Sequence, residues 1–298
     1  MDKQKVFALL AAFGATLIYG LNHTIAKVIM PDYIGAYGFI MLRILGAGLL
    51  FWMLSPFLPK EKIQSEDYLR LFFGALLGMC INMLMFFKGL SLSTPINSGV
   101  IITITPIMVL LLSYFFLSES IGWRKTVGIL IGFAGAIGLT LFGAKTQQNA
   151  PNIPLGNTLF LINSTSYAAY LIVIKPLTQK YHTITLMKWM FLLGLLLSAP
   201  VTFSEFSAVQ WTSLPFDVIW RMGFVVVGTS FLTYLFNVYA LKSLPATTVG
   251  AFIYLQPLIT IVFAVITGND FLDTNKVLAT VLIFTGVYLV TQKAKKTS

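Results

Sequence analysis

Long apolar segments separated by short polar connections run through the whole chain. A sliding window of about 19 residues predicts ten membrane spans. They cover roughly residues 6–29, 35–55, 67–88, 95–117, 122–142, 154–174, 183–203, 216–241, 246–267 and 274–292. Lipid offers no partner for free backbone groups, and the alternation of polar and apolar residues typical of a barrel is missing, so each span is predicted to be a helix. The pattern therefore predicts an all-α integral membrane protein with ten transmembrane helices.

The composition excludes a soluble protein. Apolar residues make up 57% of the 298 residues, charged residues make up 10%, and the mean hydropathy is +0.85. Soluble domains carry about a quarter charged residues. The first residues, MDKQKVFALLAAF, have the basic flank and apolar core of a secretory signal. Because many similar spans follow, we expect this segment to be the first, uncleaved helix.

The charge distribution indicates a membrane orientation. The net charge is +10, but Lys and Arg are scattered singly between apolar blocks, which argues against a nucleic-acid partner. If the N-terminus is cytoplasmic, most of these cations lie on cytoplasmic segments, and an even number of spans keeps the basic tail KAKK on the same side. We therefore expect a multi-pass protein of the cytoplasmic (inner or plasma) membrane with both termini in the cytoplasm.

An internal repeat connects the two halves of the chain. When residue 86 onward is laid on residue 237 onward without gaps, the hydropathy agrees and Thr105-Pro106 aligns with Gln256-Pro257. Five spans per half is an odd number, so the halves must be inverted in the membrane, an architecture found in many secondary transporters. The predicted organisation is a first repeat over residues 1–143, an external linker over 144–153 and a second repeat over 154–298.

The end of the first repeat also resembles a known family. Residues 106–140, PIMVLLLSYFFLSESIGWRKTVGILIGFAGAIGLT, resemble the end of the repeat in EamA-type members of the drug/metabolite transporter superfamily. The shared features are a Pro that opens a helix, an acidic residue after Leu117 and a Gly-rich last helix, carried here by Pro106, Glu119, Gly128, Gly132, Gly135 and Gly138. The second copy departs from this pattern, because Asp270 stands where Glu119 would and only Gly286 remains of the glycines. The resemblance implies a ten-helix carrier that works by alternating access, and it leaves the cargo open.

The glycines of the fifth span have the small-xxx-small spacing that lets helices approach closely. We expect them to pack inside a monomer, and a homodimer face is the alternative.

A polar stripe lies on one face of the first span. Tyr19, Asn22, His23 and Lys27 follow helical spacing. An ionised side chain at the bilayer centre costs about 2.5–3.5 kcal/mol, so the stripe is predicted to face other helices or a wet cavity. Alternatively, Lys27 extends to the headgroups and His23 is a neutral imidazole bonded to a neighbouring helix.

Arg43 lies near the middle of the second span. Its guanidinium stays protonated and needs acceptors from carbonyls, water or an anion. Arg43 is therefore a candidate substrate-binding residue, and a brace for a kinked neighbouring helix is the alternative.

Acidic residues are absent from the predicted spans. All ten map to termini, loops or helix ends, so the interior is predicted to be cationic and to prefer anions or carboxylate-bearing zwitterions. If transport is coupled to protons, His23 is the interior group with an unperturbed pKa near neutrality. The sequence has two histidines and one cysteine, Cys80, and it predicts no buried carboxylate. These residues cannot make a familiar zinc site or a catalytic pair of carboxylates. We therefore expect no cofactor, no metal and no catalytic residue.

Neutral polar and aromatic residues complete the candidate cavity. On spans three, six, eight and nine these are Asn82, Phe86, Asn163, Tyr167, Tyr170, Tyr234, Asn237 and Tyr254. Each could instead serve as interhelical glue. Pro106 and Pro257 remove a helical hydrogen bond at matching positions and are predicted gating hinges, with static kinks as the alternative.

These features favour a secondary active transporter that moves a small, carboxylate-bearing or amino-acid-like metabolite across the cytoplasmic membrane. Its expected partners are that small molecule and the lipid bilayer. An exporter of neutral or xenobiotic solutes is the alternative, and a polytopic membrane enzyme or a lipid scramblase is the least favoured.

Overall fold

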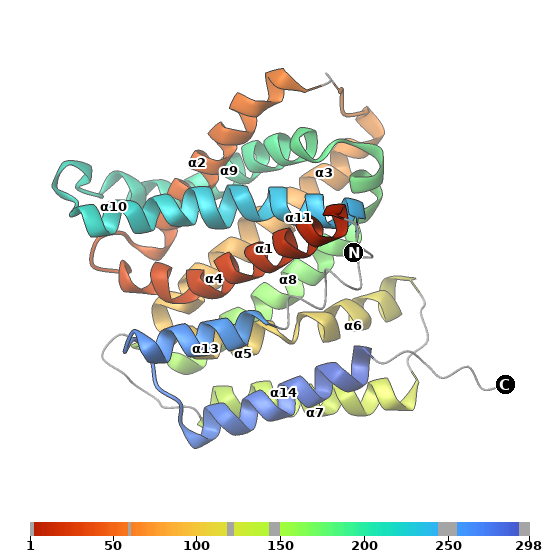
Figure 1. Ribbon diagram of the computed structural model, residues 1–298, viewed down its shortest axis with the longest axis vertical. Helices are drawn as coiled ribbons and strands as arrows, with labels where there is room; N and C mark the ends of the chain where they lie inside the picture. Colours follow the sequence, from red (N-terminus) through yellow and green to blue (C-terminus); the bar gives the residue numbers. More distant parts are fainter. Residues whose placement is uncertain (1–2, 59–60, 118–121, 143–149, 244–254, 292–298) are drawn as a thin grey trace.

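The chain folds into a bundle of helices that run side by side in both directions (Figure 1). The computed structural model describes residues 3–58, 61–117, 122–142, 150–243 and 255–291. The α-helices are α1 (Lys3–Val28), α2 (Ala36–Leu54), α3 (Tyr68–Ala75), α4 (Asn82–Leu92), α5 (Pro95–Ile102), α6 (Thr105–Leu117), α7 (Trp123–Phe142), α8 (Ile153–Lys180), α9 (Thr183–Ser207), α10 (Phe216–Gly223), α11 (Thr233–Ser243), α13 (Gln256–Ile266) and α14 (Thr274–Thr291). Short 3₁₀ turns are η1 (Ser55–Phe57), η2 (Ser65–Asp67) and η4 (Trp211–Ser213).

Seven helical segments of the described chain are long and apolar enough to cross a membrane. They are Gln4–Val28, Ala36–Phe57, Ser65–Leu92, Pro95–Phe116, Ile153–Ile174, Thr183–Ser207 and Phe216–Asn237. These segments coincide with predicted spans one to four and six to eight. The fifth, ninth and tenth predicted spans fall on α7, α13 and α14, which are not among these seven segments. The apolar parts of α13 and α14, Gln256–Ile266 and Thr274–Leu289, are shorter than the seven segments. The described residues therefore form apolar helices of membrane-spanning length, whereas the count of ten spans stays a prediction.

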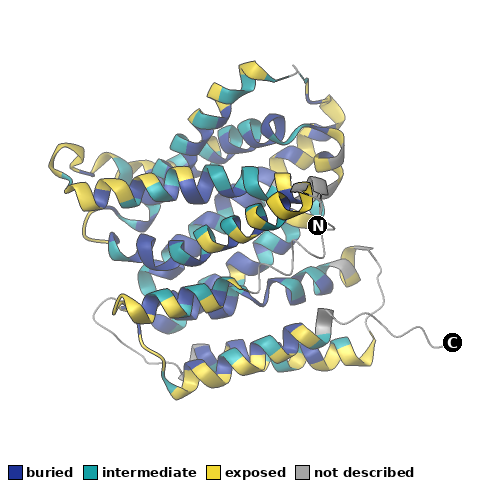
Figure 2. Cartoon of the chain, viewed as in Figure 1, coloured by how far each residue is buried: buried dark blue, intermediate teal, exposed yellow. Residues whose placement is uncertain are grey.

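The outward faces of the bundle suit contact with lipid. Figure 2 shows buried residues gathered between the helices and exposed residues on the outer sides of peripheral helices such as α7 and α14. Many of the exposed side chains are large and apolar, among them Leu130, Leu196 and Val281. A surface of this kind is unfavourable in water and favourable against acyl chains.

Two π-helical segments interrupt the bundle at comparable places in its two halves. They are η3 (Leu76–Ile81), between α3 and α4, and η5 (Phe224–Leu232), between α10 and α11. A π-helical turn leaves carbonyls without their usual helical partner, and such turns often occur at functional sites. Here Ser166 of α8 donates to the Leu77 carbonyl at 2.8 Å, and Ser230 donates to the Val225 carbonyl at 3.0 Å.

The helix of the fourth predicted span is interrupted just before its proline, Pro106. α5 ends at Ile102 and α6 begins at Thr105, with Pro106 in its first turn, so the kink predicted at Pro106 is present. Pro257 lies in the first turn of α13. Residues 244–254, which precede this helix, lie outside the described residues. Whether either proline is a hinge stays a prediction.

The glycines of α7 pack inside the chain, against α14. A Cβ atom added to Gly286 would lie 2.5 Å from the Gly128 carbonyl oxygen and 2.5 Å from the Gly132 nitrogen. A Cβ atom on Gly135 would come within 3.0 Å of the Ala279 carbonyl oxygen. Packing within the monomer, as expected from the sequence, therefore accounts for Gly128, Gly132 and Gly135, whereas a Cβ atom on Gly138 would meet no atom within 4 Å.

Candidate functional site

The bundle has two ends that differ in structure. At the N-terminal face α1 and α9 begin while α8 and α11 end, and at the opposite face α1 and α4 end while α2 and α5 begin. Apart from Lys27, which lies at the opposite face, and Tyr254, which lies outside the described residues, the predicted cavity residues lie between these faces, on α1, α2, α4, α8 and α11.

Four of the predicted tyrosines meet at the centre of the bundle. Tyr19 of α1, Tyr167 and Tyr170 of α8, and Tyr234 of α11 are close enough to interact electrostatically. The rings of Tyr167 and Tyr170 are 5.6 Å apart. Tyr19, Tyr167 and Tyr234 keep part of their surface exposed although Tyr170 beside them is buried. Three of the four rings are therefore only partly covered by neighbouring side chains.

Arg43 of α2 adjoins this cluster. The side chain is 7% exposed, its Nε–H donates to Ser230 of η5, and its guanidinium carbon lies 5.4 Å from the centre of the Phe87 ring. The Arg43 guanidinium also interacts electrostatically with the side chains of Tyr234 and Tyr19. Among the described residues no carboxylate forms a salt bridge with Arg43. Arg43 thus braces the π-helical segment with one N–H group and keeps its terminal N–H groups available.

Phenylalanine side chains wall the same region. Phe51 of α2 lies 5.3 Å from Phe191 of α9 and 5.1 Å from Phe231 of η5, measured between ring centres. Phe191 in turn packs against Tyr234 at 5.8 Å. The sequence analysis missed these phenylalanines, because an apolar residue inside an apolar span looks the same whether it faces a cavity, a helix or lipid.

The polar stripe of α1 makes three separate interhelical contacts. Asn22 accepts a hydrogen bond from Thr229 of η5 at 3.1 Å. The Nδ1 atom of His23 is 2.7 Å from the Ser98 hydroxyl, and the imidazole packs edge-on against Phe86 at 5.4 Å. The stripe therefore faces other helices, as predicted, and the His23 contact matches the alternative of an imidazole bonded to a neighbouring helix.

Lys27 is buried and does not extend to the surface of the bundle. It is 6% exposed, and its ammonium donates to the Leu90 carbonyl at 2.7 Å and the Ser91 carbonyl at 3.0 Å. These carbonyls lie at the end of α4, where a cation interacts favourably with the helix dipole. Lys27 therefore joins the ends of α1 and α4 at the opposite face, and the alternative of a headgroup contact is wrong.

Asn82 and Asn163 form a reciprocal pair between α4 and α8. The Asn82 amide donates to the Asn163 carbonyl at 3.2 Å, and the Asn163 amide donates to the Asn82 carbonyl at 2.8 Å. Both amide groups thus hold the helices together beside η3. Asn237 lies partly exposed on α11, and Tyr254 lies outside the described residues.

A buried ion pair at the opposite face was not foreseen. Asp270 and Lys276 are joined at 2.6 Å, with side-chain exposures of 0% and 3%. The other oxygen of Asp270 accepts the Ile96 N–H at the start of α5, at 3.1 Å. The prediction of an interior without carboxylates was therefore wrong for Asp270, because a residue assigned to a loop is enclosed by the ends of α5, α13 and α14.

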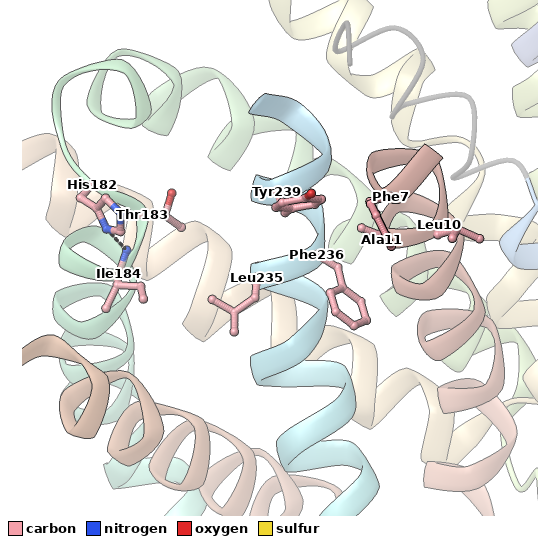
Figure 3. Close-up of a pocket in the computed structure, with 9 residues that line it drawn as sticks. All are labelled: Phe7, Leu10, Ala11, His182, Thr183, Ile184, Leu235, Phe236 and Tyr239. Atoms are coloured by element: carbon pink, nitrogen blue, oxygen red, sulfur yellow. Dashed lines mark hydrogen bonds between the residues drawn. The ribbon is translucent and has the colours of Figure 1, made fainter. Parts of the chain in front are cut away.

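The N-terminal face has an open pocket. A cavity of about 610 Å³ lies between the start of α1, the start of α9 and the end of α11. In Figure 3, Leu235, Phe236 and Tyr239 of α11 lie between Phe7 and Leu10 of α1 on one side and His182, directly before α9, on the other. The walls are mainly apolar, and Leu235 directly follows Tyr234 of the central cluster.

Charged side chains make contacts at the N-terminal face, where Lys180 and Glu66 are exposed and Asp67 is buried. Lys180, at the end of α8, forms ion pairs with Asp67 at 2.7 Å and Glu66 at 2.8 Å. The hydrogen bonds to Asp67 and Glu66 raise the pKa of the Lys180 ammonium above its usual range. Glu61 accepts the His182 N–H at 2.8 Å, so the chain before α3 is joined to the turn between α8 and α9.

Comparison with known proteins establishes the family. The model of the EamA-like transporter family matches residues 6–141 and 154–292. The chain belongs to this family. This confirms the resemblance found in residues 106–140 and identifies the protein as a multi-pass membrane transporter.

Individual relatives of this EamA-like transporter are distant. "Uncharacterized transporter YetK" of Bacillus subtilis (strain 168) is 23% identical over 299 residues, covering 99% of this chain and 89% of that protein. "S-adenosylmethionine uptake transporter" of Rickettsia conorii (strain ATCC VR-613 / Malish 7) is 25% identical over 203 residues, covering 68% and 65%. A crystal structure with 17% identity superposes with a TM-score of 0.65 over 97% of this chain and 98% of its own. That structure shares the fold.

Proposed function

We propose that this EamA-like transporter is a secondary active carrier for a small organic solute that bears a carboxylate, with amino-acid-like metabolites as the preferred class. Arg43 is the observation that carries the proposal. It is a buried cation in the middle of the bundle, and only its Nε–H is engaged by a described side chain. A carboxylate is the acceptor that fits the planar pair of terminal N–H groups.

The surroundings of Arg43 suit an organic body attached to that carboxylate. The faces of Phe51, Phe191 and Tyr234 offer apolar and aromatic contact, while the tyrosine hydroxyls offer hydrogen bonds. Pockets for small molecules typically combine apolar walls with a few polar groups that orient the ligand. One relative is named for uptake of S-adenosylmethionine, which is itself an amino-acid derivative, and this name agrees with the proposed class.

The proposed mechanism is alternating access between two inverted five-helix repeats. The family model matches the chain twice, and π-helical segments occur in both halves. A further pair of contacts supports this symmetry: Glu61, beyond the end of α2, accepts an N–H before the start of α9, and Glu205, at the end of α9, accepts N–H groups at the start of α2. An inverted repeat predicts such reciprocity.

The proposed carrier is open at its N-terminal face in this conformation. The 610 Å³ pocket lies at that face, and its lining includes Leu235, Phe236 and Tyr239 of α11. At the opposite face α1 and α13 approach closely, since Thr260 donates to the Gly20 carbonyl at 3.0 Å, and Lys27 and Asp270 join helix ends nearby. With a cytoplasmic N-terminus, this is the inward-open state.

The proposal is tested by transport of matched acids and amides. Purified protein in liposomes is assayed for counterflow of amino acids and 2-oxo acids, each compared with its primary amide, after a thermal-shift screen selects the stabilising acids. We expect the acids to exchange and the amides to fail. Arg43→Gln removes the preference for acids, and Arg43→Lys restores part of it.

The control is Arg221→Gln. Arg221 forms a partly exposed ion pair with Asp217 at 2.9 Å, so the variant makes the same substitution away from the centre and is expected to transport normally. Equal exchange of acids and amides by the wild type would contradict the proposal and favour a carrier of neutral solutes. Chemical conversion of the solute, or lipid flipping without solute exchange, would contradict transport altogether.

Proton coupling, where present, is proposed to use His23. The imidazole is buried and contacts Ser98 of α5, so a change of its charge would act on the α1–α5 contact. His23→Ala is expected to leave solute binding intact and to abolish accumulation driven by a pH gradient. Unchanged accumulation would discard this role.

A further inference from the structure

A second pocket lies away from the central site, on the side of the bundle formed by α3 and α9. Its volume is about 550 Å³, and its lining divides into a charged and an apolar part. The charged part includes Lys62 and Lys188, and the apolar part includes Leu71, Phe72 and Leu193. A pocket of this composition fits a ligand with an anionic end and an apolar end.

Lys188 contributes one of the two ammonium groups in the charged part of the pocket. It lies in the second turn of α9, donates to the Ser55 hydroxyl at 2.6 Å, and places its ammonium 5.1 Å from the centre of the Trp52 ring. In the described ranges neither Lys188 nor Lys62 forms a salt bridge with a carboxylate. These two lysines therefore leave positive charge available in the lining of the pocket.

The one carboxylate in the pocket lining is already engaged. Glu61 accepts the His182 N–H at 2.8 Å, at the start of α9. With one carboxylate against two ammonium groups, the lining keeps a net positive charge. An anion is therefore the complementary ligand.

The position of the pocket points to a lipid. Trp189 and Tyr68 line it, and amphipathic aromatic rings of this kind concentrate at the level of the headgroups. The apolar part continues onto the outer surface of the bundle, where Leu69 of α3 and Leu196 of α9 are 67% and 63% exposed. A lysine one to two turns inside the helix end extends its ammonium toward the same level.

We propose that this pocket binds an anionic phospholipid. The lipid phosphate accepts hydrogen bonds from Lys188 and Lys62, and an acyl chain follows Leu71, Phe72 and Leu193 between α3 and α9. Basic pockets between transmembrane helices are suited to anionic headgroups. The exposed apolar continuation distinguishes a lipid from a free phosphate ion, which would use only the charged part.

Native mass spectrometry of the detergent-purified chain tests the proposal. The protein is titrated with phosphatidylglycerol and with phosphatidylcholine carrying the same acyl chains. We expect tighter binding of phosphatidylglycerol, reduced about five-fold for each of Lys188→Gln and Lys62→Gln, while phosphatidylcholine binding stays unchanged. Lys188→Arg is expected to keep most of the preference.

The matched control is Arg124→Gln in the first turn of α7, an exposed cation outside this pocket. This variant should bind both lipids like the wild type. Equal binding of the two lipids, an unchanged preference in both glutamine variants, or a loss of equal size in Lys188→Arg and Lys188→Gln would overturn the proposal. Displacement of phosphatidylglycerol by millimolar inorganic phosphate would also overturn it, because the site would then be one for free anions.

Discussion

The two faces of the bundle are held together by different kinds of contact. At the opposite face the charges are buried: Lys27 binds the end of α4, and Asp270 joins Lys276 to the start of α5. At the N-terminal face Lys180 and its partner Glu66 are exposed, while Asp67, the second partner of Lys180, is buried. Water competes with exposed ion pairs and not with buried ones.

This difference indicates which end has to change in a transport cycle. A carrier that is open at one face must break the contacts at the other face before the cargo can leave there. In this conformation those contacts are the buried ones, so their loss should alter stability and conformation more than the loss of contacts at the N-terminal face.

The largest expected effect comes from breaking the buried pair. Asp270→Asn leaves the Lys276 ammonium buried without its carboxylate, and removal of one partner of a buried pair costs about 3–5 kcal/mol. Denaturant unfolding of the detergent-solubilised protein measures this loss. The control at the N-terminal face is Lys180→Gln, for which we expect a smaller change, because Lys180 is exposed and Tyr181 still donates to Asp67 at 2.7 Å. Equal losses in the two variants would remove the distinction between the faces.

Lys27→Met is expected to have an intermediate effect. The variant keeps an apolar stem and removes a charged donor from the Leu90 and Ser91 carbonyls, and a hydrogen bond to a charged group contributes about 1.5–3 kcal/mol. Lys88→Met is the matched control, because Lys88 is partly exposed and its ammonium lies 5.5 Å from the Tyr37 ring centre. A thermal melt in which Lys88→Met is the more harmful substitution would argue against a closing role for Lys27.

The smallest change in the free energy of unfolding is expected for the two carboxylates at helix starts, Glu205 and Glu61. Glu205 accepts two N–H groups of α2, from Tyr37 at 2.7 Å and Gly38 at 3.0 Å, while Glu61 accepts one. A negative charge at a helix start contributes about 0.3–1 kcal/mol. Glu205→Gln should therefore lower the free energy of unfolding by about 1 kcal/mol and Glu61→Gln by less. The reverse order would show that the number of N–H groups accepted does not set the contribution of these carboxylates.

The sequence predicted the helical membrane fold because lipid imposes strong rules. Backbone groups must be satisfied within each span and charges must avoid acyl chains, so apolar length alone locates most helices. The break before Pro106 and the packing of the α7 glycines followed from local chemistry in the same way. The π-helical segments have no comparable signature, because their apolar residues would fit an α-helix equally well.

The candidate site was predictable in part, for a related reason. Polar residues inside a span must face protein, and the structure places Asn22, His23 and four of the five predicted tyrosines, Tyr19, Tyr167, Tyr170 and Tyr234, between helices. Pattern alone could not distinguish the cap formed by Lys27 from a cavity contact, because both require a buried ammonium. Asp270 was missed because a loop position says nothing about which helix ends enclose it.

Accessibility of position 234 tests the central claim most directly. In a Cys80→Ala background, Tyr234→Cys places one thiol beside Arg43, and a membrane-impermeant maleimide is applied to right-side-out and to inverted vesicles. The account predicts modification from the side that carries the N-terminal face, with protection by a carboxylate substrate. Modification only from the opposite side, or from neither side, would contradict it.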